Sequence, residues 1–129
     1  MATGKIVAIG TSKDRSHCEH DRRLGELARA YFSLKSSLED LAERDGQIQQ
    51  EHRWTIQQEN DYQAKVDPIA TRMYDIAWGM VDIRANCLTG AHAKSQVLLD
   101  WCDPKGELKD ALATSLCSDI QTMMDARQR

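Results

Sequence analysis

The densest group of side chains that could do chemistry is a run of four residues near the N-terminus, His17, Cys18, Glu19 and His20. Imidazole and thiolate groups are the preferred protein ligands of zinc. A zinc site usually takes its ligands as two separated pairs, which lets the chain wrap around the ion, and no second pair follows this run. We therefore predict no metal or other cofactor, and keep a site built on His17, Cys18 and His20 as the alternative.

Basic side chains that could bind phosphate gather over residues 13–29. The candidates for contact with nucleic acid are Arg15, Arg22, Arg23 and Arg29. Residues 1–35 hold seven basic and four acidic side chains, a net charge of +3, whereas residues 36–65 hold three and seven, a net charge of −4. Nucleic-acid-binding domains usually carry a stronger basic excess than this chain, whose net charge is −3. We interpret both segments as ordinary solvated faces and keep nucleic-acid binding as the alternative.

Catalysis would need a nucleophile, a base beside it and a group that orients the base, and the sequence does not offer such a set. The two Glu-x-x-His motifs of di-iron bundles are absent. Residues 4–11 resemble a phosphate-binding loop only loosely, because the lysine precedes the apolar run instead of following the second glycine. Cys87, Cys102 and Cys117 lie beside apolar helix positions, where a thiol packs as a small hydrophobic group. We predict that the chain is not an enzyme.

A seven-residue apolar repeat from Leu24 to Cys87 determines the predicted fold. Its alternating steps of three and four residues keep one face of a helix against a partner. The repeat is polar between Asp45 and Glu59, so we expect two long helices that form a hairpin with its tip in this polar part. Glycine is scarce and proline occurs only at positions 68 and 104, which favours an all-α bundle of four to five helices.

The sequence predicts a flexible arm over residues 1–20 and one helical domain over residues 21–129. Residues 5–9 would suit a short strand, but no other segment of the chain is available to pair with it. Asp21 is the expected cap of the first helix, and residues 45–46, an Asp-Gly pair, are its expected end.

Further helices are expected after the hairpin tip. Pro68 either kinks one long second helix or separates two, since the repeat continues across it without slipping. Shorter helices over residues 91–102 and 103–126 should close one end of the hairpin. Thr89 and Gly90 lie before them, where threonine can cap a helix and glycine permits a close crossing.

The same region carries a short motif, Thr89-Gly90-Ala91-His92-Ala93-Lys94. It is similar to a segment of short all-helical hypothetical proteins of bacteria, in which a Thr-Gly-x-x-Ala-Lys-like motif joins two C-terminal helices. The closing helix over residues 112–120, with Ser115 and Asp119, is also similar to theirs. The resemblance implies an all-helical fold and no assigned activity, and some such proteins are encoded near phage or mobile elements. From the sequence, Lys94 is expected to be a solvated side chain.

We expect the second half of the apolar repeat to be an interaction surface. Its predicted interface residues are Tyr62, Val66, Ile69, Met73, Ile76, Met80 and Ile83. A narrow apolar seam usually needs a partner helix, which is either a second copy in a dimer or the chain's own residues 24–41. The favoured function is a small self-associating interaction or adaptor protein. The alternative is an accessory nucleic-acid-binding or regulatory protein of the phage or mobile-element type that uses residues 13–29.

The predicted location is the cytoplasm. No apolar run approaches the roughly 20 residues of a transmembrane helix, so we expect no membrane contact. The first residues lack the apolar block and cleavage site of a signal peptide. The four cysteines are therefore expected to be reduced.

Overall fold

The computed structural model describes the backbone of residues 2–51, 53–101 and 106–128, and the side chains of residues 19–48, 53–101 and 106–127. These ranges form four α-helices, α1 (Ala2–Glu51), α2 (Ile56–Val81), α3 (Leu88–Asp100) and α4 (Glu107–Gln128). They contain no strand, which confirms the all-α prediction. Among the described residues, no helix combines the length and the apolar character needed to span a membrane.

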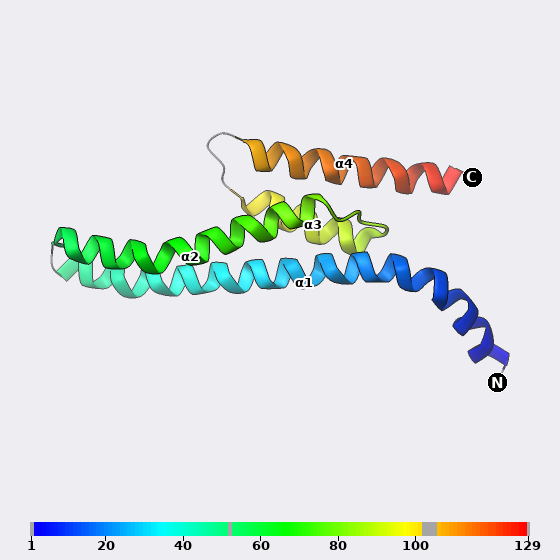
Figure 1. The fold of residues 1–129 in the computed structure, drawn as a ribbon, viewed down its shortest axis with the longest axis horizontal. Helices are drawn as coiled ribbons and strands as arrows, with labels where there is room; N and C mark the ends of the chain where they lie inside the picture. The colour runs from blue at the N-terminus through cyan, green and yellow to red at the C-terminus, as the bar shows by residue number, and fades with distance from the viewer. Residues whose placement is uncertain (1, 52, 102–105, 129) are drawn as a thin grey trace.

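Helices α1 and α2 form the long antiparallel hairpin that dominates the molecule (Figure 1). The chain reverses just before Thr55, inside the polar part of the repeat, which confirms the predicted position of the tip. Thr55 then starts α2 with a capping box, in which its hydroxyl accepts a hydrogen bond from the Gln58 amide at 3.1 Å. The Gln58 side chain in turn accepts from the Thr55 amide at 2.9 Å, so two free amides at the helix start are satisfied.

Pro68 lies inside α2, which runs through it as one helix and so answers the question left open by the sequence. Proline has no backbone N–H, and the helical bond to the carbonyl of Ala64 is therefore missing. Pro68 is exposed, so water can satisfy that carbonyl. Directly after Pro68, Ile69 packs against the core and Met73 is buried in it, so the second part of the helix is held by packing.

Helix α1 is longer at both ends than the sequence predicted. Its backbone is helical from Ala2, so a strand over residues 5–9 and a helix start at Asp21 are both corrected, while the flexible arm over residues 1–20 stays a prediction. A helix satisfies its backbone bonds internally, which a lone strand cannot do. The expected end at residues 45–46 is wrong as well, because α1 continues to Glu51; one glycine costs a helix only about 1 kcal/mol.

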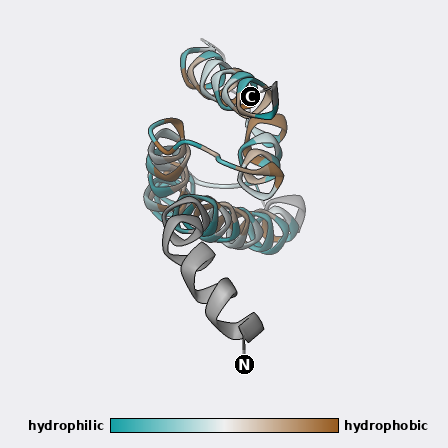
Figure 2. Ribbon diagram, turned by 90° about the vertical axis from the view of Figure 1, so that its right-hand side faces the viewer, coloured by the Kyte–Doolittle hydropathy of each residue, from teal (hydrophilic) through white to brown (hydrophobic). Residues whose placement is uncertain are grey.

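Helices α3 and α4 close one end of the hairpin, as predicted, and give the molecule three layers. Seen along the hairpin, α1 forms one outer layer, α2 and α3 the middle layer, and α4 the other outer layer (Figure 2). The buried apolar core lies between these layers at this end; its residues are Leu24, Ala28, Tyr31, Met73, Ala77, Met80, Ala85, Ala91, Ala93, Val97, Leu108 and Leu112. Leu24 and Tyr31 belong to the predicted repeat, so the repeat is mainly an internal packing face.

The predicted interface on α2 finds its partner inside the chain. Met73 and Met80 are buried in the core of a single copy, which corrects their assignment to an interface between copies. The flanking isoleucines Ile69, Ile76 and Ile83 pack against that core. Tyr62 and Val66 lie nearer the hairpin tip and are only half-buried. The sequence left open whether this apolar seam packs against a second copy or against the chain's own first helix. For Met73 and Met80, the partner is the core of the same chain.

Two leucines provide a matched test of this core. Leu112 on α4 is fully buried, whereas Leu99 on α3 is 83% exposed. We expect Leu112→Ala to lower the free energy of unfolding by about 2–5 kcal/mol, because it removes buried methyl groups and leaves a cavity. Leu99→Ala should change it by less than about 0.5 kcal/mol. Urea denaturation followed by circular dichroism measures both, and equal losses would contradict the assigned packing of α4.

Candidate functional site

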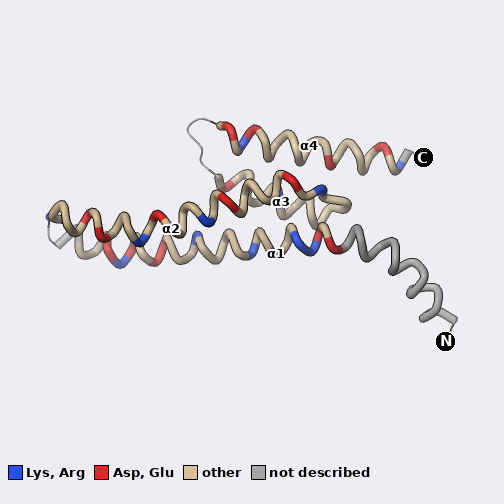
Figure 3. Tube along the Cα trace, in the orientation of Figure 1, with Lys and Arg blue, Asp and Glu red and all other residues tan. Residues whose placement is uncertain are grey.

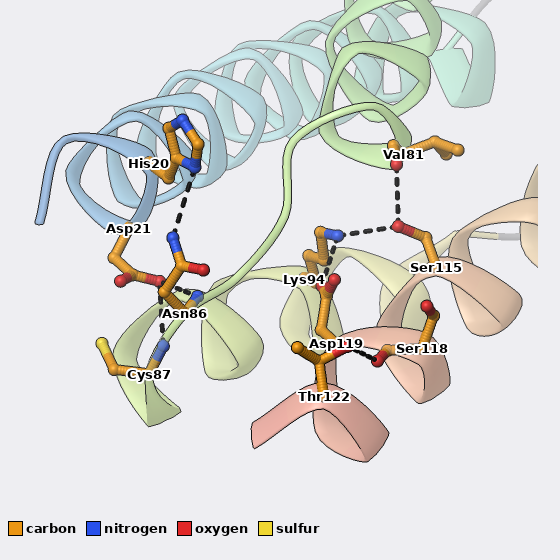
Figure 4. Close-up of polar contacts among 10 residues, drawn as sticks. All are labelled: His20, Asp21, Val81, Asn86, Cys87, Lys94, Ser115, Ser118, Asp119 and Thr122. Carbon is orange, nitrogen blue, oxygen red and sulfur yellow. Dashed lines mark hydrogen bonds and ion pairs between the residues drawn. The ribbon is translucent and has the colours of Figure 1, made fainter. Parts of the chain in front are cut away.

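A buried carboxylate on α1 caps the start of α3. Asp21 is 5% exposed, and its Oδ1 accepts hydrogen bonds from the backbone amides of Asn86, at 3.0 Å, and Cys87, at 3.4 Å (Figure 4). Cys87 is the N-cap residue of α3 and makes no capping bond with its own side chain. The carboxylate therefore replaces a local cap and lies at the positive end of the α3 dipole. This corrects the prediction that Asp21 caps the first helix.

Gly90 makes this contact possible. A β-carbon added to Gly90 would lie 2.0 Å from Asp21 Oδ1 and 3.1 Å from the β-carbon of Ala85, so there is no room for a side chain. Beside it, the Asn86 side-chain amide lies 3.2 Å from His20 Nδ1, which adds a second polar contact between α1 and the loop before α3. The close crossing expected at Gly90 is confirmed. Thr89 is an exposed residue inside α3 and does not cap it.

The far end of α3 is also tied to α1. Tyr31, whose side chain is buried, donates from its hydroxyl to Asp100 Oδ2 at 2.8 Å. Lys35 forms an ion pair with the other oxygen of the same carboxylate. Trp101 follows directly, and its ring lies at a tilt to that of Tyr31 with centroids 6.3 Å apart. Helix α3 is thus fixed to α1 at both of its ends.

We expect Gly90→Ala to separate α1 from α3. The added methyl group would displace the Asp21 carboxylate and leave it and the amides of Asn86 and Cys87 poorly satisfied, which should lower the free energy of unfolding by about 2–4 kcal/mol. Gly79 in α2 is the matched control, because nothing lies within 4 Å of an added β-carbon there. Gly79→Ala should raise the stability by about 0.5–1 kcal/mol. Thermal and urea unfolding of the two variants should shift in opposite directions, and shifts in the same direction would contradict this account.

A buried ion pair joins α3 to α4. Lys94 is fully buried, and its Nζ donates to Asp119 Oδ2 at 2.5 Å and to Ser115 Oγ at 2.8 Å (Figure 4). The Ser115 hydroxyl donates in turn to the carbonyl of Val81 at 2.7 Å, near the end of α2. Each group in this chain of contacts has a partner, which is the condition for keeping charges in a protein interior. The prediction of a solvated Lys94 is wrong.

The Lys94–Ser115 contact resembles a base beside a nucleophile, but its geometry does not suit catalysis. A general base must offer a free electron pair, and an ammonium ion held by a carboxylate has only N–H donors. Lys94 donates to Ser115, and the proton of Ser115 is directed to the Val81 carbonyl. We therefore assign Lys94, Ser115 and Asp119 a structural role in docking α4.

The buried pair yields a second stability test. Lys94→Met leaves the Asp119 carboxylate buried without its cation, so we expect the free energy of unfolding to fall by about 3–5 kcal/mol. Adding Asp119→Asn to that variant should recover part of the loss, because an amide carries no charge. Lys109 on the exposed side of α4 is the control, and Lys109→Met should change stability by less than about 0.5 kcal/mol. A loss for Lys94→Met as small as that of the control would show that the ion pair does not dock α4.

Two surface hollows lie beside α4. One, of about 350 Å³, opens between α4 and the end of α2, and its wall includes Ser115, Asp119 and Arg84. Its walls carry charges of both signs, and its buried polar groups are already paired within the protein. The other, of about 390 Å³, is an apolar groove between the start of α3 and the last turns of α4, lined by Asn86, Cys87, Leu88, Ile120, Met123, Met124, Ala126 and Arg127. We call this second hollow the α3–α4 groove.

The predicted metal cluster is only partly visible. The side chains of His17 and Cys18 lie outside the described residues, and His20 is exposed and contacts Asn86. Among the side chains that are described, no three histidine, cysteine, aspartate or glutamate groups gather closely enough to hold a metal ion. Cys87 and Cys117 are exposed free thiols, which corrects their predicted role as packing residues, while Cys102 lies outside the described range.

The basic candidates lie along α1, where acidic neighbours compete for them. Arg22 pairs with Glu19 at 2.9 Å and lies 3.6 Å from Glu26, and Arg23 lies 3.9 Å from the same Glu26. The remaining described candidate, Arg29, is exposed, while Arg15 lies outside the described side chains. Local ion pairs reduce the positive potential that a phosphate backbone would meet. Nucleic-acid binding therefore stays a prediction without support from these contacts.

Comparison with protein-family models found no match to this chain, and neither did comparison with curated proteins or with solved structures. The resemblance to bacterial hypothetical proteins therefore stays a prediction. Fold and contacts together define a small all-α protein in which, among the described residues, the buried Asp21, Lys94 and Asp119 join one helix to another.

Proposed function

We propose that the protein is a small helical interaction protein without catalytic activity, and that it self-associates, most simply as a dimer. The observation that carries this proposal is the apolar surface around the α3–α4 groove. Leu88 is 78% exposed, Met124 53% and Ile120 42%, although all three lie close together on one end of the bundle. Apolar side chains gathered in one place on a surface are typical of a binding site, whereas single scattered ones are not.

The chemistry of this surface fits a protein partner better than a small substrate. Each large apolar side chain gains about 1.5–3 kcal/mol when it becomes fully buried, so a few of them can drive association. The groove offers one charged side chain, Arg127, and no arrangement of acid, base and nucleophile. Two exposed thiols, Cys87 and Cys117, suit a reducing compartment, which supports a cytoplasmic location within the proposal.

The test is the molecular mass in solution over a concentration series, by sedimentation velocity and native mass spectrometry. We expect a monomer–dimer equilibrium. Met124→Asp should raise the dimer dissociation constant more than about tenfold, because it removes buried apolar area and places a charge in the contact. Leu99→Asp is the control, since Leu99 is 83% exposed but lies outside the groove, and it should leave the equilibrium unchanged. A protein that stays monomeric at the highest concentration reached would refute self-association.

A further inference from the structure

The outer face of α4 carries a second regular stripe, distinct from the one that packs inward. Its residues are Asp110, Ala113, Cys117, Ile120, Met124 and Arg127, separated by steps of three, four, three, four and three. This spacing keeps all six on one face of the helix. Ala113 is half-buried and the other five are exposed. The inward stripe, with Leu108, Leu112 and Asp119 buried, lies more than a third of a turn away at about 100° per residue.

Helix α4 is an outermost layer of the bundle and packs against α2 and α3 (Figures 1 and 2). The stripe is largely uncovered in the single chain, and its last three residues, Ile120, Met124 and Arg127, also line the α3–α4 groove. The order of residues along the stripe indicates which kind of partner surface would be complementary to it. It has an acid at one end and a base at the other, and a small side chain next to the acid, Ala113, with a large one next to the base, Met124.

We propose that two copies of the chain pair antiparallel through their α4 helices, about a two-fold axis between Cys117 and Ile120. In that arrangement Asp110 of one copy faces Arg127 of the other. Ala113 faces Met124, and Cys117 faces Ile120. Every contact occurs twice, as a two-fold axis requires. The proposal rests on the self-association proposed above and assigns its partner, orientation and register.

Charge selects this orientation. On the stripe itself the acid, Asp110, lies in the first turns of α4 and the base, Arg127, in its last turn; off the stripe, Lys109 and Asp125 place a charge of the other sign near each end, as Figure 3 shows along the helix. Among the described side chains, neither Asp110 nor Arg127 is engaged in an ion pair. An antiparallel pair brings them together, whereas a parallel pair places like charges opposite each other, which is unfavourable.

The small area of the α4 stripe indicates that the dimer forms reversibly. The stripe spans 18 residues, or about 27 Å of helix at 1.5 Å per residue. One pair of helices of this length buries less than the roughly 800 Å² per partner of a standard interface. Leu88 and Met123 flank the stripe in the α3–α4 groove and extend the apolar area beside Ile120 and Met124. We expect an equilibrium that depends on protein concentration and weakens as salt screens the two ion pairs.

A charge exchange tests the register. Asp110→Arg places two arginines opposite each other at both ends of the dimer, and Arg127→Asp places two aspartates there. Each single change should raise the dimer dissociation constant about tenfold, and the double variant D110R/R127D should return it to within about threefold of the original. Mixing the two single variants should form a heterodimer, because each arginine then faces an aspartate. Asp125→Arg, the same change of charge off the stripe, should have little effect.

Sedimentation velocity measures the dissociation constants, and circular dichroism shows that each variant folds. An unmodified protein that is monomeric throughout would overturn both this inference and the proposed function. A dimer that is insensitive to the single changes, or one that neither the double variant nor the mixture restores, would overturn the antiparallel α4 contact while leaving self-association in place. The mixture keeps the test decisive even where the double variant is unstable.

Discussion

The arrangement of all four helices depends on how α3 is held. This helix has 13 residues, too few to be stable in water without tertiary packing. Asp21 on α1 accepts from the amides of Asn86 and Cys87 just before α3 begins, and Asp119 on α4 pairs with the buried Lys94 of α3. The two carboxylates come from opposite layers of the bundle, so α3 links the hairpin to α4. Gly90 is the condition for the first of these contacts, because any side chain at that position would occupy the place of the carboxylate.

The sequence predicted burial well where buried residues recur every three or four positions along one helix. The repeat predicted the hairpin, its polar tip and the apolar faces that carry Leu24, Tyr31, Met73 and Met80, because each is a matter of neighbouring turns on one helix. It could not predict that the partner of Met73 and Met80 is the chain's own core and not a second copy. It could not predict the role of Asp21, since the amides that it caps lie 65 and 66 positions further along the chain. A local rule assigns a polar residue near a helix start to the nearest helix, and here that rule chose the wrong one.

Lys94 shows a signal that sequence reasoning could have used. It lies one turn before the buried Val97 on α3, while Asp119 continues the series Leu108, Leu112 and Ser115 on α4. Opposite charges on the apolar faces of two consecutive helices indicate a buried ion pair. A single lysine on such a face, without an acidic residue on the next helix, does not. The exposed apolar residues Leu88 and Met124 gave no such signal, because composition does not say which side of a helix its neighbours cover.

The hairpin of α1 and α2 extends well beyond the buried core. The free energy needed to open its backbone hydrogen bonds should therefore differ along the two helices. Between Thr55 and Asp61 every side chain is exposed, and a ring pair of Trp54 and Tyr62, whose centroids lie 5.1 Å apart, is a described contact near the tip. Backbone hydrogen bonds there can open locally without disturbing any buried contact at the α3 end. Amide hydrogens should therefore exchange with solvent fastest at the tip and progressively more slowly towards Met80, along helices that remain continuous. Helices α1 and α2 are therefore stable where they pack against the core and open locally at the hairpin tip, although each is a continuous helix.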